Sequence, residues 1–383
     1  MGAKAESVAA GRPMSRTYSD EQLLRSDPAT WRPAFLALAS REDVADLIET
    51  PLPLLNFVLH GLKDEERYRE FEIPKANGKS RLIQAPLPPL LFIQARLHQV
   101  LTAVYRPKPS VHGFVADRGI ATNARRHAHK RFVLNLDLAD FFPTIHFGRV
   151  QGMFAGRPYF LPQPVATMLA QICCYRRCLP QGAPTSPVVS NMLCGRLDSE
   201  LQEFANRYDC HYTRYADDIT FSTSRRTFPA EVASGWEQAV VLGDGLRQII
   251  EANGFTLNDS KQRLQPAWRH QEVTGLTVNE APNVRRAYVR QVRAMLHAWD
   301  VYGIEDAERE HRRRWRGQSA LPRREGEESG FKEVVRGKLA FLQSVRSGPG
   351  TPHAGLVLKF QALERRDRAQ RRGRIRRKAD DGN

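Results

Sequence analysis

The sequence predicts an α+β protein in which an antiparallel sheet is backed by helices, and two observations support this prediction. Residues 132–138 alternate large apolar side chains with Val, Asn and Asp, the period-two pattern of a strand with one apolar face. Residues 210–215 and 219–222 are two more strand-favouring runs, and Asp217 and Asp218 lie where they meet. Together these runs predict a β-hairpin with both aspartates at its turn.

Length and charge restrict the classes of protein that this chain can represent. It has 383 residues, enough for two or three lobes, and a formal net charge of +16. This excess favours a polyanionic partner, above all nucleic acid, although a basic structural binder would show the same balance. The sequence has no apolar run of roughly 18 residues and no apolar signal core at its N-terminus, so we expect no membrane association and a cytoplasmic location. The five cysteines lack zinc-site spacing and are expected to be reduced.

A third carboxylate, Asp137, strengthens the interpretation of the hairpin. Asp217 and Asp218 repel each other, so a chain that keeps both needs a compensating cation, although a solvated turn can also carry such a pair. Asp137 is expected at the end of the 132–138 strand, on the face opposite the core. Oxygen ligands suit a hard divalent cation, Mg²⁺ or Mn²⁺. Three aspartates from neighbouring strands fit a two-metal site for phosphoryl transfer.

With these residues in view, the chain resembles the reverse transcriptases. Tyr215-Ala216-Asp217-Asp218 matches the YxDD box of that family, and Asp137 matches its first catalytic aspartate. Between them, the segment Leu-Pro-Gln-Gly-Ala-Pro-Thr-Ser-Pro-Val-Val-Ser-Asn at 179–191 resembles the motif that positions template and nucleotide. The resemblance extends from about residue 68 to about 345. It implies a right-hand polymerase with fingers, palm and helical thumb, which makes DNA on an RNA template with two Mg²⁺ ions, Mn²⁺ being an alternative.

The same resemblance assigns roles toward the incoming deoxynucleoside triphosphate. Residues 68–83 predict a β-hairpin like that of the fingers, in which Lys79 and Arg81 would contact the triphosphate. A solvated basic hairpin is the alternative for both residues. Phe142 corresponds to the family's steric gate against a 2′-hydroxyl, and a core aromatic is the alternative. Asp140 is left outside the metal triad.

Three further positions are assigned to the nucleotide or its pyrophosphate. Gln181 can hydrogen-bond to the nucleotide or template, and Gly182 permits close approach of the backbone. Lys261 matches a lysine placed near the pyrophosphate, and an ordinary surface lysine is its alternative.

Two short motifs narrow the resemblance to the retron enzymes. Asn123-Ala124-x-x-His127 looks like their NAxxH motif, and Val273-Thr274-Gly275 looks like their VTG motif. The resemblance implies a structured non-coding RNA partner, priming from an RNA 2′-hydroxyl, a branched RNA-linked single-stranded DNA, and antiphage defence with a possible effector protein. A satisfied structural histidine is the alternative for His127. The candidate RNA-binding residues are Asn123, His127, Val273, Thr274, Gly275, Arg286 and Arg290.

The domain organisation is expected to follow the order of a right-hand polymerase. Apolar spacing predicts amphipathic helices over 90–105 and 232–253, and nine Lys or Arg against four acidic residues predict a solvated, irregular tail after 360. The expected parts are a disordered N-terminus at 1–18, N-terminal helices and fingers at 19–110, a palm at 111–281 with a fingers insertion at about 150–180, a helical thumb at 282–360, and a basic tail at 361–383.

Three alternatives stay open. A group II intron-type enzyme has similar catalytic boxes, but this chain has little space for a maturase extension. Another defence-linked reverse transcriptase would fit if the two short motifs mislead. A catalytically idle RNA-binding component is the third alternative, against which the intact Asp137, Phe142, Gln181, Asp217 and Asp218 argue.

Overall fold

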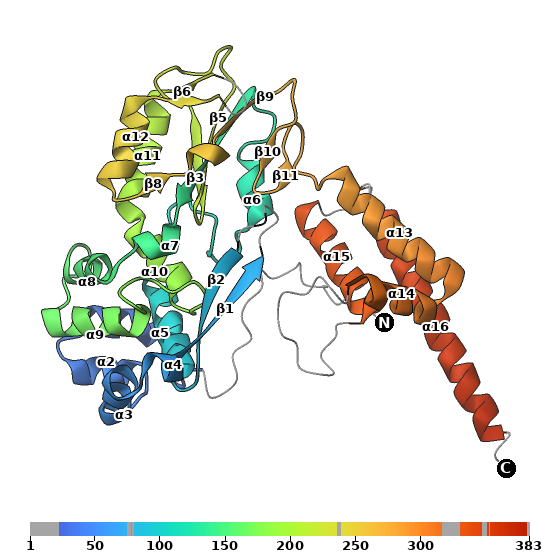
Figure 1. Cartoon of the computed structure of the whole chain (residues 1–383), viewed down its shortest axis with the longest axis horizontal. Helices are drawn as coiled ribbons and strands as arrows, with labels where there is room; N and C mark the ends of the chain where they lie inside the picture. The colour runs from blue at the N-terminus through green and yellow to red at the C-terminus, as the bar shows by residue number, and fades with distance from the viewer. Residues whose placement is uncertain are drawn as a thin grey trace, which may run out of the picture. The chain divides into compact units, whose positions relative to one another are not determined.

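The computed structural model divides into two compact units, and the chain passes from one to the other between Thr274 and Gly275 (Figure 1). The N-terminal unit contains the sheet, and the C-terminal unit is mainly helical. The structure describes residues 23–74, 78, 80–235, 239–315, 330–346, 351 and 353–380. Within these residues, no helix is both long enough and apolar enough to cross a membrane. The predicted N-terminal segment 1–18 lies outside them.

An antiparallel sheet of five strands forms the centre of the N-terminal unit, so the predicted α+β class is confirmed. The strand order is β4-β5-β3-β8, and β9 also pairs with β3. The strands are β3 (Phe132–Ala139), β4 (His211–Tyr215), β5 (Asp218–Thr223), β8 (Thr256–Leu257) and β9 (Arg263–Pro266). Strand β3 is buried on both faces rather than one, and it continues two residues beyond Asp137. Asp137 is therefore inside the strand, and the expectation of a terminal position on an open face is wrong.

Several helices pack beside the sheet. Helices α11 (Gly195–Arg207) and α12 (Asp244–Ala252) pack against each other beside the sheet, and α6 (Ile120–Arg125) contacts β4 (Figure 1). Helix α10 (Ser186–Leu193) begins with Ser186 and Pro187, and the residue at its N-cap is Thr185.

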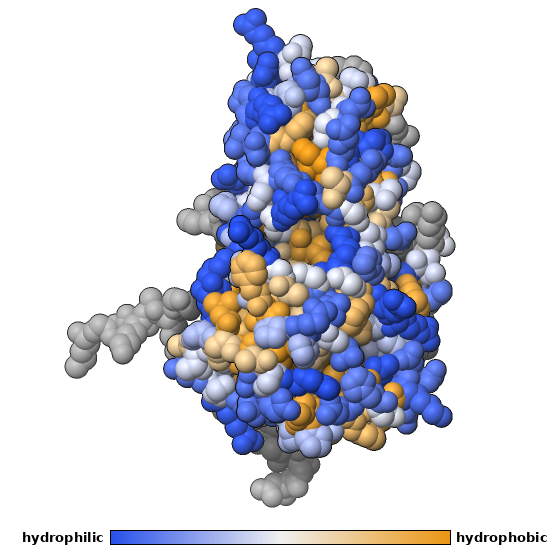
Figure 2. Space-filling view, turned by 90° about the vertical axis from the view of Figure 1, so that its left-hand side faces the viewer, coloured by the Kyte–Doolittle hydropathy of each residue, from blue (hydrophilic) through white to orange (hydrophobic). Residues whose placement is uncertain are grey.

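A group of helices packs together at one end of the unit, at the lower left of Figure 1. They comprise α1 (Pro28–Leu36), α2 (Arg41–Leu47), α3 (Leu52–Asn56), the π-helix η2 (Phe57–Gly61), α4 (Asp64–Arg67), α5 (Leu90–Val104), α8 (Phe147–Ala155) and α9 (Gln163–Cys173). The predicted helix at 90–105 is confirmed, and its apolar stripe is buried. In the view of Figure 2, hydrophobic residues gather on the lower part of the surface. Exposed apolar side chains include Leu36, Leu54 and Phe57 of this group and Phe160 in the loop between α8 and α9. The helical group therefore combines a buried core with an apolar outer surface.

Short elements complete the unit and correct one expectation. They are β1 (Tyr68–Pro74) and β2 (Ser80–Pro86), α7 (Phe141–Thr144), β6 (Ala233–Ser234), β7 (Val241–Leu242), the 3-10 helix η3 (Asp259–Lys261) and β10 (Glu272–Val273). The predicted helix over 232–253 is wrong before Asp244, because β6 and β7 pair there as a small hairpin. Gly235 adopts a φ of +85°, a conformation that favours glycine and a turn over a helix.

The C-terminal unit packs its helices around a cluster of aromatic rings. Its elements are β11 (Leu276–Thr277), α13 (Arg286–Tyr302), α14 (Ile304–Trp315), α15 (Phe331–Val345) and α16 (Ala354–Asp380). The indole of Trp299 is fully buried, and its ring centroid lies 6.3 Å from that of Phe331 and 5.5 Å from that of Phe360. These edge-to-face contacts join α13, α15 and α16.

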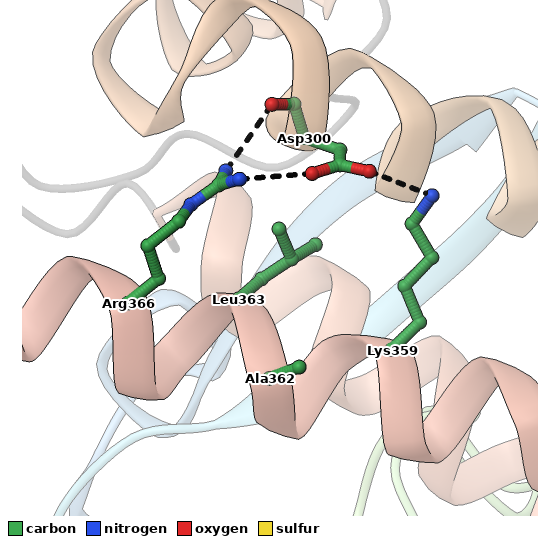
Figure 3. A pocket seen from close by; sticks show the side chains of 5 residues that line it. All are labelled: Asp300, Lys359, Ala362, Leu363 and Arg366. Atoms are coloured by element: carbon green, nitrogen blue, oxygen red, sulfur yellow. Dashed lines mark hydrogen bonds and ion pairs between the residues drawn. The ribbon is translucent and has the colours of Figure 1, made fainter.

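The expectation of an irregular tail is wrong as far as Asp380, because residues 361–380 continue α16. Figure 3 shows contacts that hold α16 to α13 as far as Arg366, since Lys359 Nζ lies 3.0 Å and Arg366 Nη1 2.9 Å from the Asp300 carboxylate. Arg366 Nη2 also donates to the main-chain oxygens of Trp299 and Asp300. Acidic and main-chain acceptors on α13 thus hold basic side chains that the sequence alone leaves to solvent.

Candidate active site

The two adjacent aspartates lie where the sequence places them, at the turn between β4 and β5. The strand register pairs Asp137 of β3 with Asp218 of β5. The carbonyl oxygen of Asp217 accepts a hydrogen bond from the Leu138 N–H at 3.0 Å, which ties the turn to β3. The strand pairing therefore brings the three predicted carboxylates together at one end of the sheet.

The carboxylates form a cluster whose negative charges repel one another. Burial raises the pKa of Asp218 to about 7, and the neighbouring charges of Asp217 and Asp137 add to that shift. Burial also raises the pKa of Asp217, with a further contribution from Asp137, while Lys261 and Arg81 act in the opposite direction. Both shifts come first from burial and then from the neighbouring negative charges, and a cation bound at the carboxylates would oppose both causes.

Two side chains from the segment after β8 bind Asp137. Lys261 Nζ forms an ion pair with Asp137 Oδ2 at 2.7 Å, and Asn258 Nδ2 donates to Oδ1 at 3.3 Å. The Asn258 N–H also donates to the Asp137 carbonyl oxygen at 2.8 Å. Sequence reasoning selected Lys261 but missed Asn258, although the short spacing between them was visible in the sequence.

The donor set suits a divalent cation, although the present arrangement is not a formed metal centre. Among the residues that the structure describes, no three His, Cys, Asp or Glu side chains form a group that could hold a metal ion. The ammonium group of Lys261 is bound to Asp137 and supplies the local positive charge. Buried carboxylates with raised pKa values, such as those of Asp217 and Asp218, are oxygen donors that a hard cation would favour in their ionised form.

The β1–β2 hairpin brings a basic side chain toward the carboxylates. Arg81 is exposed on β2, and its charge lowers the pKa of Asp217. The loop with Gln181 and Gly182 packs against the same strand, since the Gln84 N–H donates to the Gln181 carbonyl oxygen at 2.8 Å. Gly182 has a φ of +138°, and a Cβ there would lie 2.8 Å from the Gln84 carbonyl oxygen. A larger residue would push the loop from β2. Lys79 lies outside the described residues.

The adjacent residues Phe141 and Phe142 have different surroundings. Phe141 is buried, and its ring stacks on that of Phe255 with centroids 5.6 Å apart. Phe142 is only half-buried, and its ring centroid lies 6.4 Å from that of the exposed Phe114. This difference agrees with a core role for Phe141 and leaves part of the Phe142 ring available to a ligand.

The NAxxH residues Asn123 and His127 are buried, and this geometry favours a structural role over direct contact with RNA. Asn123 and His127 are both fully buried. One ring nitrogen of His127 bonds to Ser222 Oγ and the other to Thr213 Oγ1, each at 2.7 Å. Burial lowers the pKa of His127 well below its usual value. This histidine is held as a neutral ring behind β4 and β5, where it supports the sheet.

The two short motifs lie beside each other in the fold. Helix α6 contains Asn123 and contacts β10, which ends at the buried Val273. Thr274 Oγ1 donates to the Ile120 carbonyl oxygen at the start of α6, at 3.3 Å. Residues 150 apart thereby form one local structure. In the C-terminal unit, Arg286 and Arg290 are exposed on α13 as predicted.

A buried ion pair next to the turn was not found by sequence reasoning. The guanidinium of Arg214, which directly precedes the YxDD box, binds both carboxylate oxygens of Asp198 on α11, at 2.7 and 2.8 Å. Both residues are fully buried. The only signal in the sequence was a charged residue within a strand-favouring run, and nothing there identified its partner.

Comparison with known proteins agrees with this geometry. Residues 73–278 match the family model described as reverse transcriptase (RNA-dependent DNA polymerase). The chain is 34% identical over 296 residues to the Retron Mx65 reverse transcriptase of Myxococcus xanthus, covering 73% of this chain and 65% of the relative. It is 37% identical over 257 residues to the Retron Mx162 reverse transcriptase of the same organism, covering 60% and 52%. For the Retron Ec86 reverse transcriptase of Escherichia coli the identity is 32% over 252 residues, covering 65% and 74%.

The matched portion of the relatives differs in extent. The chain spans just under two thirds of the Mx65 enzyme and about half of the Mx162 enzyme. Proteins of the matched family generally use divalent metal ions. The family match covers every strand of the sheet with Asp137, Asp217 and Asp218.

Proposed function

The chain belongs to the reverse transcriptase family, and within it to the retron reverse transcriptases, and we propose that it is an RNA-directed DNA polymerase acting on a structured non-coding RNA. One observation carries the proposal most directly. The strand register pairs Asp137 with Asp218, and Asp217 adjoins that pair in a motif that matches the family. The predicted resemblance to retron enzymes is confirmed at the level of family.

In the proposed reaction, the primer hydroxyl attacks the α-phosphate of a deoxynucleoside triphosphate. Asp137, Asp217 and Asp218 would hold two Mg²⁺ ions, with Mn²⁺ as a substitute. Bound ions of this kind supply Lewis acidity that activates the hydroxyl and stabilises the leaving pyrophosphate. Carboxylates must be ionised to bind cations, so the raised pKa values of Asp217 and Asp218 favour binding near or above neutral pH.

The surrounding residues bind and orient the nucleotide. Lys79 and Arg81 on the fingers hairpin would contact the triphosphate. The electrostatic effect of Arg81 on Asp217 supports this role for Arg81. Lys261 would leave Asp137 and stabilise the pyrophosphate. The other proposed nucleotide contacts are Gln181 and Gly182 in the loop against β2, and the half-exposed Phe142 as the gate against a 2′-hydroxyl.

The right-hand domain assignment is part of the same proposal. The sheet with its three aspartates would be the palm, and β1 with β2 would belong to the fingers. The helices α13 to α15 and the first residues of α16 would form the thumb, with the exposed Arg286 and Arg290 available to a phosphate backbone. The proposed boundaries are 19–110, 111–281 with a fingers insertion at about 150–180, 282–360, and 361–383 as a basic extension.

The retron relatives support a specific partner and product. We propose that the chain recognises a structured RNA, primes from a 2′-hydroxyl within it, and makes a branched RNA-linked single-stranded DNA. A role in antiphage defence with a protein effector is the finer part of this proposal. The relatives' names support the retron class, and the net charge of +16 supports the RNA partner.

A primer-extension assay tests the proposed reaction directly. Purified protein would be given an RNA template, a DNA primer, deoxynucleoside triphosphates and Mg²⁺, with the Asp217→Asn variant in parallel. We expect extension by the wild-type protein and a loss of roughly 10²- to 10³-fold or more in the variant, because a metal-binding carboxylate is removed. RNA binding and the melting temperature should be retained in the variant.

Expression in cells tests the retron part separately. The gene with its flanking DNA would be expressed, and short nucleic acids would be isolated before and after ribonuclease and debranching treatment. A discrete DNA species that Asp217→Asn abolishes, and whose 5′ end is freed by debranching, is the expected result. Extension in vitro without such a DNA would favour a group II intron-like or other defence-linked enzyme. RNA binding with no extension under any condition would favour an idle RNA-binding component.

A further inference from the structure

The buried pair of Arg214 and Asp198 adjoins the catalytic turn without belonging to the carboxylate cluster. Two guanidinium nitrogens of Arg214 bind the two oxygens of Asp198, and Tyr212 Oη donates to the same carboxylate at 2.8 Å. Taking two charges out of water is costly, and apolar residues of similar size often stabilise a fold at least as well. Stabilisation of the packing between α11 and β4 is therefore not a sufficient explanation for a buried ion pair at this position.

One nitrogen of the guanidinium is directed at the turn itself. Arg214 Nη1 donates to the carbonyl oxygen of Ala216 at 3.0 Å. Ala216 has a φ of +57°, which is uncommon for a residue with a Cβ, so contacts outside the turn must maintain this conformation. The next carbonyl oxygen, that of Asp217, accepts from the Leu138 N–H. Arg214 and β3 thus fix the two peptide groups that flank Asp217.

Two further residues support the turn. Asn191 at α10 accepts from Arg214 Nη1 at 3.1 Å, and its Nδ2 donates to the Gly113 carbonyl oxygen at 2.8 Å. The backbone of Gly113 passes directly against the turn, because a Cβ there would lie 2.5 Å from the Ala216 nitrogen. Segment 110–113 is also bonded to Arg214, whose N–H donates to the Ser110 carbonyl oxygen at 2.9 Å.

These contacts define a turn clamp, which consists of Gly113, Asn191, Asp198 and Arg214. We propose that the clamp positions the catalytic turn, so that the carboxylates of Asp217 and Asp218 are presented to divalent metal in one fixed orientation. This inference deepens the polymerase function proposed above and rests on it for the role of the metal. The proposed clamp residues position the turn and contact neither metal nor substrate. Their loss should weaken metal binding and lower kcat, with little effect on KM for the nucleotide.

Arg214→Lys is the first test, with Tyr212→Phe as its matched control. Lysine keeps the positive charge near Asp198 but cannot bind both carboxylate oxygens and Ala216 together. Tyr212→Phe removes a hydrogen bond to the same buried carboxylate without touching the turn. The measurements are Mn²⁺ affinity by electron paramagnetic resonance without nucleic acid, the Mg²⁺ half-saturation of primer extension, kcat, KM, and the melting temperature.

We expect Arg214→Lys to weaken Mn²⁺ binding and raise the Mg²⁺ half-saturation by about 10-fold or more, as for other groups that orient metal ligands. Tyr212→Phe should change both by less than about twofold, even though its melting temperature falls. Equal changes in metal affinity in the two variants would overturn the proposal, as would an unchanged affinity in Arg214→Lys.

Gly113→Ala provides a second test, which leaves the buried charges intact. The added methyl group would press on the Ala216 nitrogen and displace the turn, so metal affinity and kcat should fall as in Arg214→Lys. Gly152→Ala on α8 is its control, because a Cβ there meets no atom within 4 Å. Wild-type metal affinity in a folded Gly113→Ala protein would overturn the clamp.

The Mn²⁺ readout separates this proposal from the polymerase function. If the wild-type protein binds Mn²⁺ but makes no DNA, the proposed function fails. The Mn²⁺ affinities of Arg214→Lys and Gly113→Ala still test whether the clamp positions the carboxylates. If DNA is made and neither Arg214→Lys nor Gly113→Ala alters metal dependence, the clamp fails and the function stands.

Discussion

Two clusters of charged residues lie next to the turn between β4 and β5. One is the proposed metal site, and the other is a buried ion pair that supports the turn. Where β3 pairs with β5, Asp137, Asp217 and Asp218 lie near one another, and burial together with the neighbouring negative charges raises the pKa values of Asp217 and Asp218. Next to the same turn, Asp198 and Arg214 are fully buried and matched in charge and geometry. The first cluster gains by binding a cation from solution, whereas the second is complete within the protein.

The largest expected effect comes from breaking the balanced cluster. Asp198→Ala leaves the guanidinium of Arg214 buried without its counter-ion, so the free energy of unfolding should fall by about 3–5 kcal/mol. Urea titration of the metal-free protein measures it. On the same helix, Glu203 forms only an exposed pair with Arg207, and Glu203→Ala should cost no more than about 1 kcal/mol. Similar losses in the two variants would contradict the contrast.

The second prediction concerns the pH dependence of the unbalanced cluster. The pKa of Asp218 is raised to about 7 in the folded protein, so the folded state binds that proton more tightly than the unfolded chain does. Its contribution to the stability of the metal-free protein is therefore present at low pH and is lost as the pH rises from about 4 to about 7. The loss should be roughly 2–4 kcal/mol at pH 8.

Asp218→Asn removes this titrating group, so the variant should gain stability relative to wild type at pH 8 in EDTA and not at pH 4. Mg²⁺ should reduce the difference at pH 8 by binding the ionised wild-type site. Parallel stability curves for the two proteins between pH 4 and pH 8 would show that Asp218 does not titrate in this range.

Lys261 offers a way to change the cluster's charge from within. Lys261→Met removes the cation from Asp137, so metal should bind at least as tightly as in wild type, because no ammonium group competes for the carboxylate. Activity should nevertheless fall by roughly 10²-fold if the same lysine acts on the pyrophosphate. Primer extension at saturating Mg²⁺ separates the two effects. Unchanged kcat would leave Lys261 only the role of a charge partner.

The smallest effect is expected on the surface of the C-terminal unit. Asp300 binds Lys359 and Arg366, but all three side chains are more than a third exposed. Asp300→Asn should lower the melting temperature by less than about 2 °C, and less at high salt, because solvent and ions screen such pairs. A shift as large as that of Asp198→Ala would show that exposure does not separate the two kinds of ion pair.

The sequence by itself determined which carboxylates come together at one end of the sheet. Alternation over 132–138 and the strand-favouring runs around Asp217 were enough to predict neighbouring strands with aspartates at one end, because side-chain direction in a strand follows from residue spacing. The pattern over 68–83 likewise predicted a hairpin, which the pairing of β1 with β2 confirms. These features depend on contacts close in sequence or on a pattern that the backbone imposes.

Only the tertiary structure decided which charges are paired and buried. Arg214 on β4 has its partner on helix α11, His127 bonds to two strands, and Arg366 reaches an aspartate 66 residues away. No local spacing encodes these pairs, since each depends on how complete elements pack. Burial then sets their roles, because a charged or polar group removed from water must find its partner wherever the fold places one.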